Sequence, residues 1–286
     1  MASLPVFATI GTAYRFLGRE FVTVLRLAWF PLLVVAVVQY LAALAALDTV
    51  AAGGVDQAVA SPYDLVQWVV QTVVFAIVAV SLHRVILFDD RKPGQYIAFA
   101  FGRPEIIFMV LQVLAFAAYS VVGLIFVVAS GGRAVSMAEP PPLGSILSFI
   151  VILAALTYAL VRLTPLYPIA IAENRLDFRQ GWELTHGKFW RLFMVFALGM
   201  LPLGCVIALA EGIFWGVLAQ NIKGSEFSTE QAAAVVKGLI VYQIGIFYVF
   251  AVLASGLGVA LLCYSYKSLR GLHADALLTP EYPVRP

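Results

Sequence analysis

Residues 105–129, EIIFMVLQVLAFAAYSVVGLIFVVA, contain one charged side chain, Glu105. A helix that crosses the hydrocarbon core of a bilayer needs about 20 mostly apolar residues, because the core is about 30 Å thick and the helix rises about 1.5 Å per residue. This stretch therefore predicts a membrane-spanning helix. Five more stretches meet the same requirement, so we predict six spans, at residues 24–47, 65–88, 105–129, 146–172, 189–219 and 232–266.

The composition of the whole chain points to the same class. Of 286 residues, 62% are hydrophobic and 12% are charged, whereas a soluble domain is about 45–50% apolar and about 25% charged. These values exclude a soluble globular protein and a disordered one, and the net charge of +2 excludes a nucleic-acid binder with a large basic face. Continuous apolar runs favour helices over a barrel. We predict an all-α polytopic membrane protein.

The chain is expected to form one integral membrane domain over residues 1–286. Residues 1–23 would form an N-terminal interfacial helix, since Phe7, Ile10, Tyr14, Leu17 and Phe21 recur at helical spacing. Residues 24–266 would form the six-helix bundle, and residues 267–286 a cytoplasmic tail. Its two cysteines, Cys205 and Cys263, are isolated in apolar runs and are expected to act as small hydrophobes.

The distribution of basic residues predicts the orientation. Cytoplasmic loops are enriched in Lys and Arg, and the N-terminal segment, the even-to-odd connections and the C-terminal tail hold all the basic residues except Arg133, Lys223 and Lys237. We therefore expect both termini in the cytoplasm and a multi-pass protein of the bacterial inner membrane. The first external loop, 48–64, carries three aspartates and no basic residue. Arg84, Arg162 and Lys267 end the even spans and are expected to extend to the lipid headgroups.

An internal repeat is one interpretation of three Gly-basic pairs, Gly18-Arg19, Gly102-Arg103 and Gly187-Lys188, which precede the odd spans at nearly equal spacing. Each would belong to a unit of one interfacial helix and one helical hairpin. In the middle unit the interfacial segment, with Tyr96 and Phe99, is poorly formed. The alternative is coincidence, because any chain of hairpins with basic cytoplasmic loops shows such pairs.

The segment 168–192, PIAIAENRLDFRQGWELTHGKFWRL, carries the most polar chemistry. Together with the tail 264–270, YSYKSLR, it resembles the bacterial glycerophosphoryl diester phosphodiesterase membrane-domain family and related six-span proteins of unknown function. Those proteins have a Trp-x-Leu-Thr-x-Gly-basic-Phe-Trp run that opens a span. The resemblance implies a membrane module and carries over no catalytic residue and no substrate. Spans and short loops fill this chain, so we expect no phosphodiesterase domain in it.

The same segment is the candidate cytoplasmic surface for lipids or a partner protein. Aromatic and basic side chains together attract anionic headgroups, although every anchored membrane protein has such a belt. Pro165 and Pro168 are expected to end the fourth helix, so that 163–172 lies shallowly among the headgroups. The candidate surface residues are Glu173, Arg179, Trp182, His186, Lys188, Trp190 and Arg191.

Small residues form a candidate helix-packing face in the fifth span, at Gly204, Ala208, Gly212 and Gly216. Such a face lets another backbone approach closely. Packing within the chain, against Ala251, Ser255 and Gly258 of the sixth span, is the favoured interpretation, and an oligomer interface is the other.

No motif points to catalysis, and we expect no enzyme activity, no cofactor and no metal site. An enzyme would need at least two of five residues within hydrogen-bond reach of each other, namely His83, His186, His273, Glu173 and Asp90. The leading hypothesis is a non-catalytic accessory, scaffold or envelope-homeostasis protein that organises membrane lipids or a membrane protein partner, or forms a homo-oligomer, and binds no nucleic acid. The alternative is a transporter or lipid translocator with a cavity between the hairpins, lined by Gln39, Gln71, Gln112 or Tyr242.

Overall fold

The computed structural model describes residues 4–51, 62–90, 101–130, 142–222 and 229–271. All regular elements within these ranges are helices. In chain order they are α1 (Val6–Arg19), α2 (Phe21–Ala51), α3 (Pro62–Phe88), α4 (Arg103–Ala129), α5 (Leu143–Leu163), α6 (Leu166–Glu173), α7 (Phe178–Leu184), α8 (Phe189–Ile222) and α9 (Thr229–Leu269).

Six helical stretches are long and apolar enough to cross a membrane. They are Phe21–Leu47, Tyr63–Phe88, Arg103–Ala129, Leu143–Glu173, Phe189–Gly216 and Gly238–Leu269. Each overlaps one of the six spans expected from the sequence, so the predicted all-α polytopic membrane fold is confirmed.

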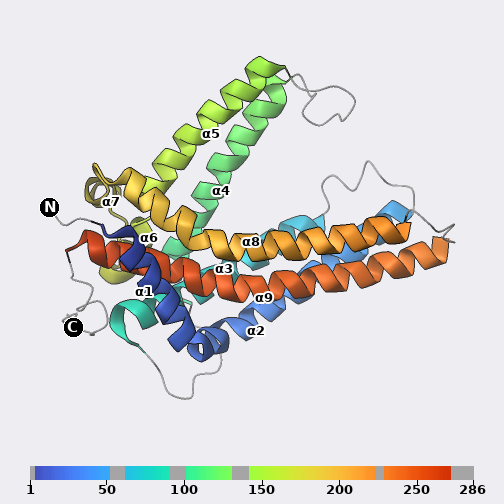
Figure 1. The fold of residues 1–286 in the computed structure, drawn as a ribbon, viewed down its shortest axis with the longest axis horizontal. Coiled ribbons are helices and arrows are strands. Elements are labelled where there is room, and N and C mark those ends of the chain that lie inside the picture. The colour runs from blue at the N-terminus through green and yellow to red at the C-terminus, as the bar shows by residue number, and fades with distance from the viewer. Residues whose placement is uncertain (1–3, 52–61, 91–100, 131–141, 223–228, 272–286) are drawn as a thin grey trace.

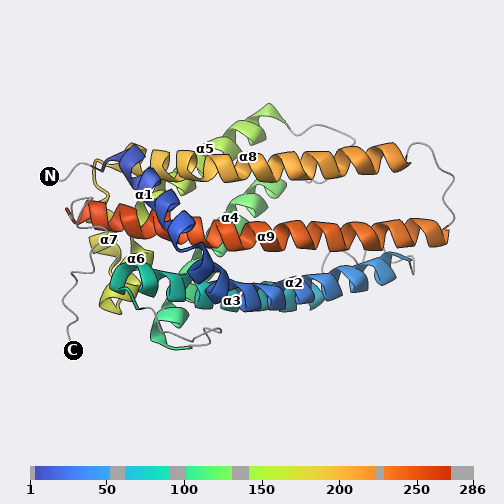
Figure 2. The same cartoon turned by 60° about the horizontal axis from the view of Figure 1, so that its bottom comes forward.

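Four long helices, α2, α3, α8 and α9, run alongside one another, while the α4–α5 hairpin diverges from them (Figures 1 and 2). The short helices α1, α6 and α7 gather at the end of the bundle where α9 finishes. We call this the proximal end, and the opposite end, where α3 begins, the distal end. Consequently the hairpin touches the other helices chiefly near the proximal end.

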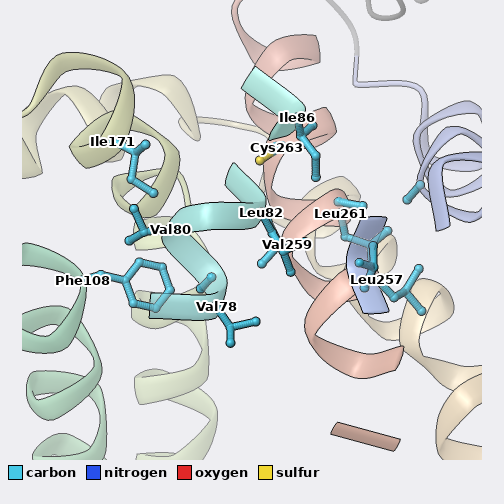
Figure 3. Packing of buried hydrophobic residues seen from close by; sticks show 14 of the residues in the cluster. Val78, Val80, Leu82, Ile86, Phe108, Ile171, Leu257, Val259, Leu261 and Cys263 are labelled. Carbon is cyan, nitrogen blue, oxygen red and sulfur yellow. The ribbon is translucent and has the colours of Figure 1, made fainter. Parts of the chain in front are cut away.

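The hydrophobic core is built around α3 and α9. Helix α3 is buried on all sides over one stretch, with Ala76, Val78, Val80 and Leu82 each at most about 1% exposed, as expected for a helix that is apolar all round. Figure 3 shows residues of α3 meeting those of α9 here, among them Cys263. Cys263 is buried as a small hydrophobe, whereas Cys205 on α8 is exposed.

The α4–α5 hairpin contributes little to this core. Of the 21 residues of α5, only Ser145 and Arg162 are buried, and most large apolar side chains of both helices point outward, for example Leu124 and Val151. In a chain that crosses a membrane these side chains face lipid, which solvates them as well as a protein core would.

Helix α1 lies within the segment 1–23 that was predicted to be helical, and it packs on α8 and α9. The Tyr14 hydroxyl donates a hydrogen bond to the carbonyl oxygen of Gly199 on α8 at 2.8 Å, and burial raises the pKa of Tyr14. On α9, Gly256 allows a close approach, since a Cβ there would lie 2.8 Å from Val24 and 3.0 Å from Leu17.

The fourth span breaks where the prolines predicted it would. Helix α5 ends at Leu163 and α6 begins after Pro165, because proline cannot continue the hydrogen-bond ladder of the preceding turn. Ile169 and Ala170 are fully buried in the protein, so these residues do not face headgroups as was expected of 163–172. The depth of this segment in the membrane stays a prediction. Helix α6 packs against α3, α4 and α9, where its apolar residues meet protein on most sides.

The proposed repeat is not reflected in a shared backbone conformation at its three glycines. Gly18 lies in the last turn of α1, Gly102 is extended at the N-cap of α4, and Gly187 adopts a left-handed φ of 70° between α7 and α8. Only the third position requires glycine on conformational grounds. The interfacial segment of the middle unit, with Tyr96 and Phe99, lies outside the described residues.

Candidate functional site

Two of the three cations that end the even spans, Arg162 and Lys267, are buried inside the protein, so the expectation that they extend to headgroups is wrong for these two. The Arg84 side chain is 33% exposed, and for it the expectation stays a prediction. Lys267 is 6% exposed and donates from Nζ to the carbonyl oxygen of Ile86 at 2.8 Å, which joins α9 to α3. Arg84 pairs with the buried carboxylate of Glu105 at 3.5 Å, which joins α3 to α4. A buried cation is stable only when its donors find acceptors, and the bundle supplies them.

Arg162, at the end of α5, makes the most extensive of these connections. Its Nη2 donates to the carbonyl oxygen of Trp182 at 2.7 Å, its Nη1 to the Tyr158 hydroxyl and its Nε to the Thr185 hydroxyl, both at 3.3 Å. The guanidinium carbon lies 3.8 Å from the centroid of the Trp182 ring. The Thr185 hydroxyl in turn donates to the carbonyl oxygen of Arg162 at 3.1 Å.

This geometry gives the Trp-x-Leu-Thr run of the sequence a structural role, which is to bind Arg162. Trp182 and Thr185 stand three residues apart, so they share one face of α7 and its final turn, and that face binds the arginine of a different span. Gly181 belongs to the same contact, because a Cβ there would lie 3.0 Å from the Leu166 side chain.

Glu173, the last residue of α6, is the centre of a second polar cluster. Its carboxylate accepts hydrogen bonds from Arg175 at 2.8 Å, from Gln180 Nε2 at 3.0 Å and from Arg270 beyond α9. Asp177 caps α7 by accepting from the backbone N–H of Gln180 at 2.9 Å. The cluster therefore connects α6, α7 and the end of α9. Sequence analysis missed Arg270, which is distant from Glu173 along the chain.

The predicted cytoplasmic surface is accordingly divided in two. Glu173 and Trp182 are engaged with other parts of the bundle, and Arg179 pairs with Glu183 one turn along α7 at 2.7 Å. The other members, His186, Lys188, Trp190 and Arg191, are exposed or half-buried at the start of α8. Trp190, at 72% exposed, is the most prominent of them.

A cavity of about 520 Å³ lies between α3, α4, α8 and α9 and is partly open to the surroundings. Helix α4 contributes Phe108 and Gln112, from the part of that helix nearest its start at Arg103. Its lining is mostly apolar, and α9 supplies the longest wall. The lining residues are Phe75, Ala79, Phe108, Gln112, Ile207, Glu211, Gln243, Ile246, Phe247, Phe250, Ala251, Ala254, Ser255, Gly258, Val259 and Leu262.

The wall from α9 is smooth over its middle part because small side chains follow one another there. Ala251, Ala254, Ser255 and Gly258 all line the cavity, and a Cβ on Gly258 would meet no atom within 4 Å. The Ser255 hydroxyl donates to the carbonyl oxygen of Ala251 at 2.7 Å, so it is satisfied within its own helix. This part of the wall presents an apolar surface with room beside it.

Polar groups occur at two levels of the cavity. Gln112 on α4 lies at the middle level, and its Oε1 is buried without a hydrogen-bond partner among the described residues. Glu211 on α8 and Gln243 on α9 lie toward the distal end. Buried polar atoms normally have partners, so the oxygen of Gln112 is an exception among the described lining residues.

A second, smaller cavity of about 300 Å³ lies between α2, α3 and α9 near the distal end. Gln243 and Phe247 line both cavities, so these two side chains stand between them. The residues that line the smaller cavity are Gln39, Ala42, Ala43, Ala46, Asp64, Gln67, Ile240, Gln243, Ile244 and Phe247.

Sequence analysis identified part of this lining. Of the four residues expected to line a cavity, Gln112 lines the larger one and Gln39 the smaller one, while Gln71 lines neither. Tyr242 stacks on Phe214 instead, with ring centroids 5.2 Å apart. Glu211 also lines the larger cavity and was not among the residues predicted to do so. The periodicity of one helix does not show which of its positions meet the other three helices around the cavity, so the full lining could not be predicted.

The small-residue face of α8 packs against none of the described residues, so the favoured interpretation, packing against Ala251, Ser255 and Gly258, is wrong. Gly204, Ala208, Gly212 and Gly216 are all exposed, and a Cβ on any of the three glycines would meet no described atom within 4 Å. The small residues of α9 that were expected to meet them line the cavity instead. The reason is that α9 turns this side toward the diverging hairpin.

The histidines offer no constellation for metal or acid–base chemistry in the described part of the chain. His83 is fully buried in α3, where its Nδ1 lies 2.7 Å from the carbonyl oxygen of Ala79 and its Nε2 has no partner. His186 is exposed after α7, and His273 lies outside the described residues. No group of three His, Cys, Asp or Glu side chains is arranged for a metal ion among the residues described.

Comparisons with protein-family models, with curated proteins and with solved structures find no match for this chain.

Proposed function

We propose that this chain is a non-catalytic integral protein of the bacterial inner membrane that binds membrane lipid in the cavity between α3, α4, α8 and α9. In doing so it would act as an accessory or scaffold protein that organises lipids or presents them to a partner protein. The observation that carries this proposal is the cavity itself, with a volume of about 520 Å³ and a mostly apolar lining inside a membrane-spanning bundle.

The physical argument starts from what surrounds the molecule. An apolar cavity open to a bilayer is next to acyl chains, and a volume in the range of about 300–1,000 Å³ is typical of small-ligand sites. Filling it with a chain restores dispersion contacts that an empty space would forfeit. The smooth wall of Ala251, Ala254 and Gly258 admits a chain along α9.

The distribution of basic residues supports the placement of the proximal end in the cytoplasm. Arg175, Arg179, Lys188, Arg191 and Arg270 gather around α6, α7 and the ends of α8 and α9, as expected of the positive-inside rule. The exposed Trp190 beside them suits the headgroup level. The resemblance of 168–192 to six-span membrane modules supports the same assignment to a membrane module.

The test fills the cavity. We would substitute Gly258→Phe, which places a ring in the open space next to α9, and compare it with Gly245→Phe on the same helix, outside the lining. Each protein would be extracted in mild detergent, and the retained lipids counted by native mass spectrometry. We expect the wild type and the Gly245 variant to retain lipid that the Gly258 variant loses.

Equal lipid retention by all three proteins would contradict the proposal. A folding defect is detected separately, by the size-exclusion profile and the helical circular dichroism of each variant. Both variants introduce the same side chain, so the two measurements can be compared directly.

A lipid translocator is a second candidate, and one observation favours it. The two cavities share Gln243 and Phe247 as common lining residues, so movement of two side chains would join them. Substituting Phe247→Ala would then increase lipid movement between leaflets of reconstituted vesicles, measured with a fluorescent lipid and dithionite. A rate no higher than that of protein-free vesicles, in wild type and variant alike, would contradict this second function.

A further inference from the structure

The described lining of the larger cavity contains an acidic side chain and no basic one. Among its described lining residues, Glu211 is the one ionisable side chain, and none is a lysine or an arginine. The smaller cavity repeats this pattern, with Asp64 as the one ionisable side chain among its described lining residues. Among the described lining residues, the larger cavity therefore has one carboxylate, Glu211, and no cation. An anionic headgroup would find repulsion there, whereas a cationic one would find a partner.

The polar and apolar parts of the larger cavity lie at different depths. Glu211 stands about 33 Å along the axis of α8 from its start at Phe189, at about 1.5 Å per residue, and Gln243 of α9 lines the cavity near it. Phe108 and Leu262 line the opposite, proximal part. Since the hydrocarbon core is about 30 Å thick, a bundle with Phe189 at the proximal membrane surface would place this carboxylate near the distal surface and the apolar part of the cavity within the core.

A cavity that is polar at its distal end and apolar at its proximal end matches a molecule with one polar head and one long apolar chain. The chain of that molecule would lie along Ala254 and Gly258, where α9 carries no bulky side chain. Its head would lie beside Glu211 and Gln243, with aromatic rings of Phe247 and Phe250 in the same wall. Aromatic faces attract ammonium groups, which adds to the preference that the carboxylate creates.

We propose that the larger cavity selects amphiphiles with a cationic head, an amine or a quaternary ammonium group on a long alkyl chain, and that Glu211 is the residue that determines this selectivity. The inference rests on the proposed function, because it requires that the cavity bind amphiphiles at all. It adds the headgroup class, the depth at which the head binds and the side chain that recognises it.

The experiment uses the full chain in phosphatidylcholine nanodiscs and three photoreactive probes. All carry the same diazirine-bearing alkyl chain, and their heads are trimethylammonium, phosphocholine or sulfonate. Crosslinks would be mapped by mass spectrometry, and labelling of the cavity wall on α9 would be divided by labelling of the outward face of α4–α5. This ratio removes differences in how much probe enters the bilayer.

We expect the normalised labelling of the wall to favour trimethylammonium over sulfonate by about tenfold, as charge-assisted contacts in partly desolvated sites do. Glu211→Gln should bring the ratio close to one while the alkyl chain still labels the wall. Glu211→Asp should keep most of the preference. Glu183→Gln, which removes a carboxylate on exposed α7, is the matched control and should leave the ratio unchanged.

The outcomes separate this inference from the proposed function. Labelling of the wall without headgroup preference, or a preference that survives in Glu211→Gln, would overturn the inference and leave the lipid cavity in place. No labelling of the wall by any probe, with normal labelling of α4–α5, would overturn both. Stronger labelling by the sulfonate probe would also contradict the role given to Glu211.

Discussion

Arg162 donates a 2.7 Å hydrogen bond to the carbonyl oxygen of Trp182, and its guanidinium carbon lies 3.8 Å from the centroid of the Trp182 ring. The two residues belong to different helices, α5 and α7, and their contact attaches the diverging hairpin to the proximal end of the bundle. Since Ser145 and Arg162 are the buried residues of α5, this contact has a large share in fixing where α5 lies.

Substituting Arg162→Lys should lower the stability by about 2–3 kcal/mol, because an ammonium group replaces neither the planar stack on Trp182 nor all three hydrogen bonds. The measurement is the apparent Tm in mild detergent. Arg191→Lys, at an exposed position on α8, is the control and should leave Tm unchanged. A Tm equal to that of wild type in the Arg162 variant would show that the hairpin is positioned by other contacts.

Substituting Lys267→Met should destabilise the junction of α3 and α9 by about 1–3 kcal/mol, because the carbonyl oxygen of Ile86 loses its side-chain donor in a buried place. Lys188→Met, at the half-buried start of α8, removes the same charge without this contact. Hydrogen exchange of the last turns of α3 would report the local effect. Equal exchange in both variants would count against a structural role for Lys267.

Substituting Gly256→Leu should destabilise the packing of α1 and α2 on α9 by about 1–3 kcal/mol, as overpacking does. A Cβ added at this position would lie 2.8 Å from the Val24 side chain, so a longer side chain must push the helices apart. Gly245→Leu adds the same side chain in open space on the same helix. The prediction fails if proteolysis and apparent Tm rank the two variants equally.

Membrane orientation is tested with single cysteines in the Cys205→Ala background, which removes the exposed thiol and keeps the buried Cys263. A cysteine at Gly53 should react with a membrane-impermeant maleimide added outside intact cells, because its loop is predicted to be external. A cysteine at Gly94 should react only after the cells are opened. Reaction of both on one side would overturn the six-span topology.

Several parts of the structure could be predicted from particular residues. The run 105–129 predicted α4, because a single apolar segment in lipid can hydrogen-bond all of its backbone groups only as a helix. Pro165 predicted the end of α5. Pro5, by contrast, precedes α1 without a side-chain cap, whereas Asp177 caps α7 through the backbone N–H of Gln180.

Other features depended on neighbours that the local sequence does not name. Arg162 and Lys267 have the spacing of residues that extend to headgroups, and they bind buried carbonyl oxygens instead. The glycines of α8 have the spacing of a packing face, yet they remain exposed. In each case the periodicity shows which residues share a face, and it carries no information on what that face meets.

By itself, the sequence determined that the chain has six membrane-spanning helices. The length and hydropathy of a segment decide whether it can cross the hydrocarbon core, and a segment that crosses must be helical to make its backbone hydrogen bonds internally. Only the tertiary structure decided that α4 and α5 diverge from the other spans and that Gln112, Glu211 and Gln243 border one cavity. Those positions come from three helices, and their meeting depends on the angles at which whole helices pack, which no single segment encodes.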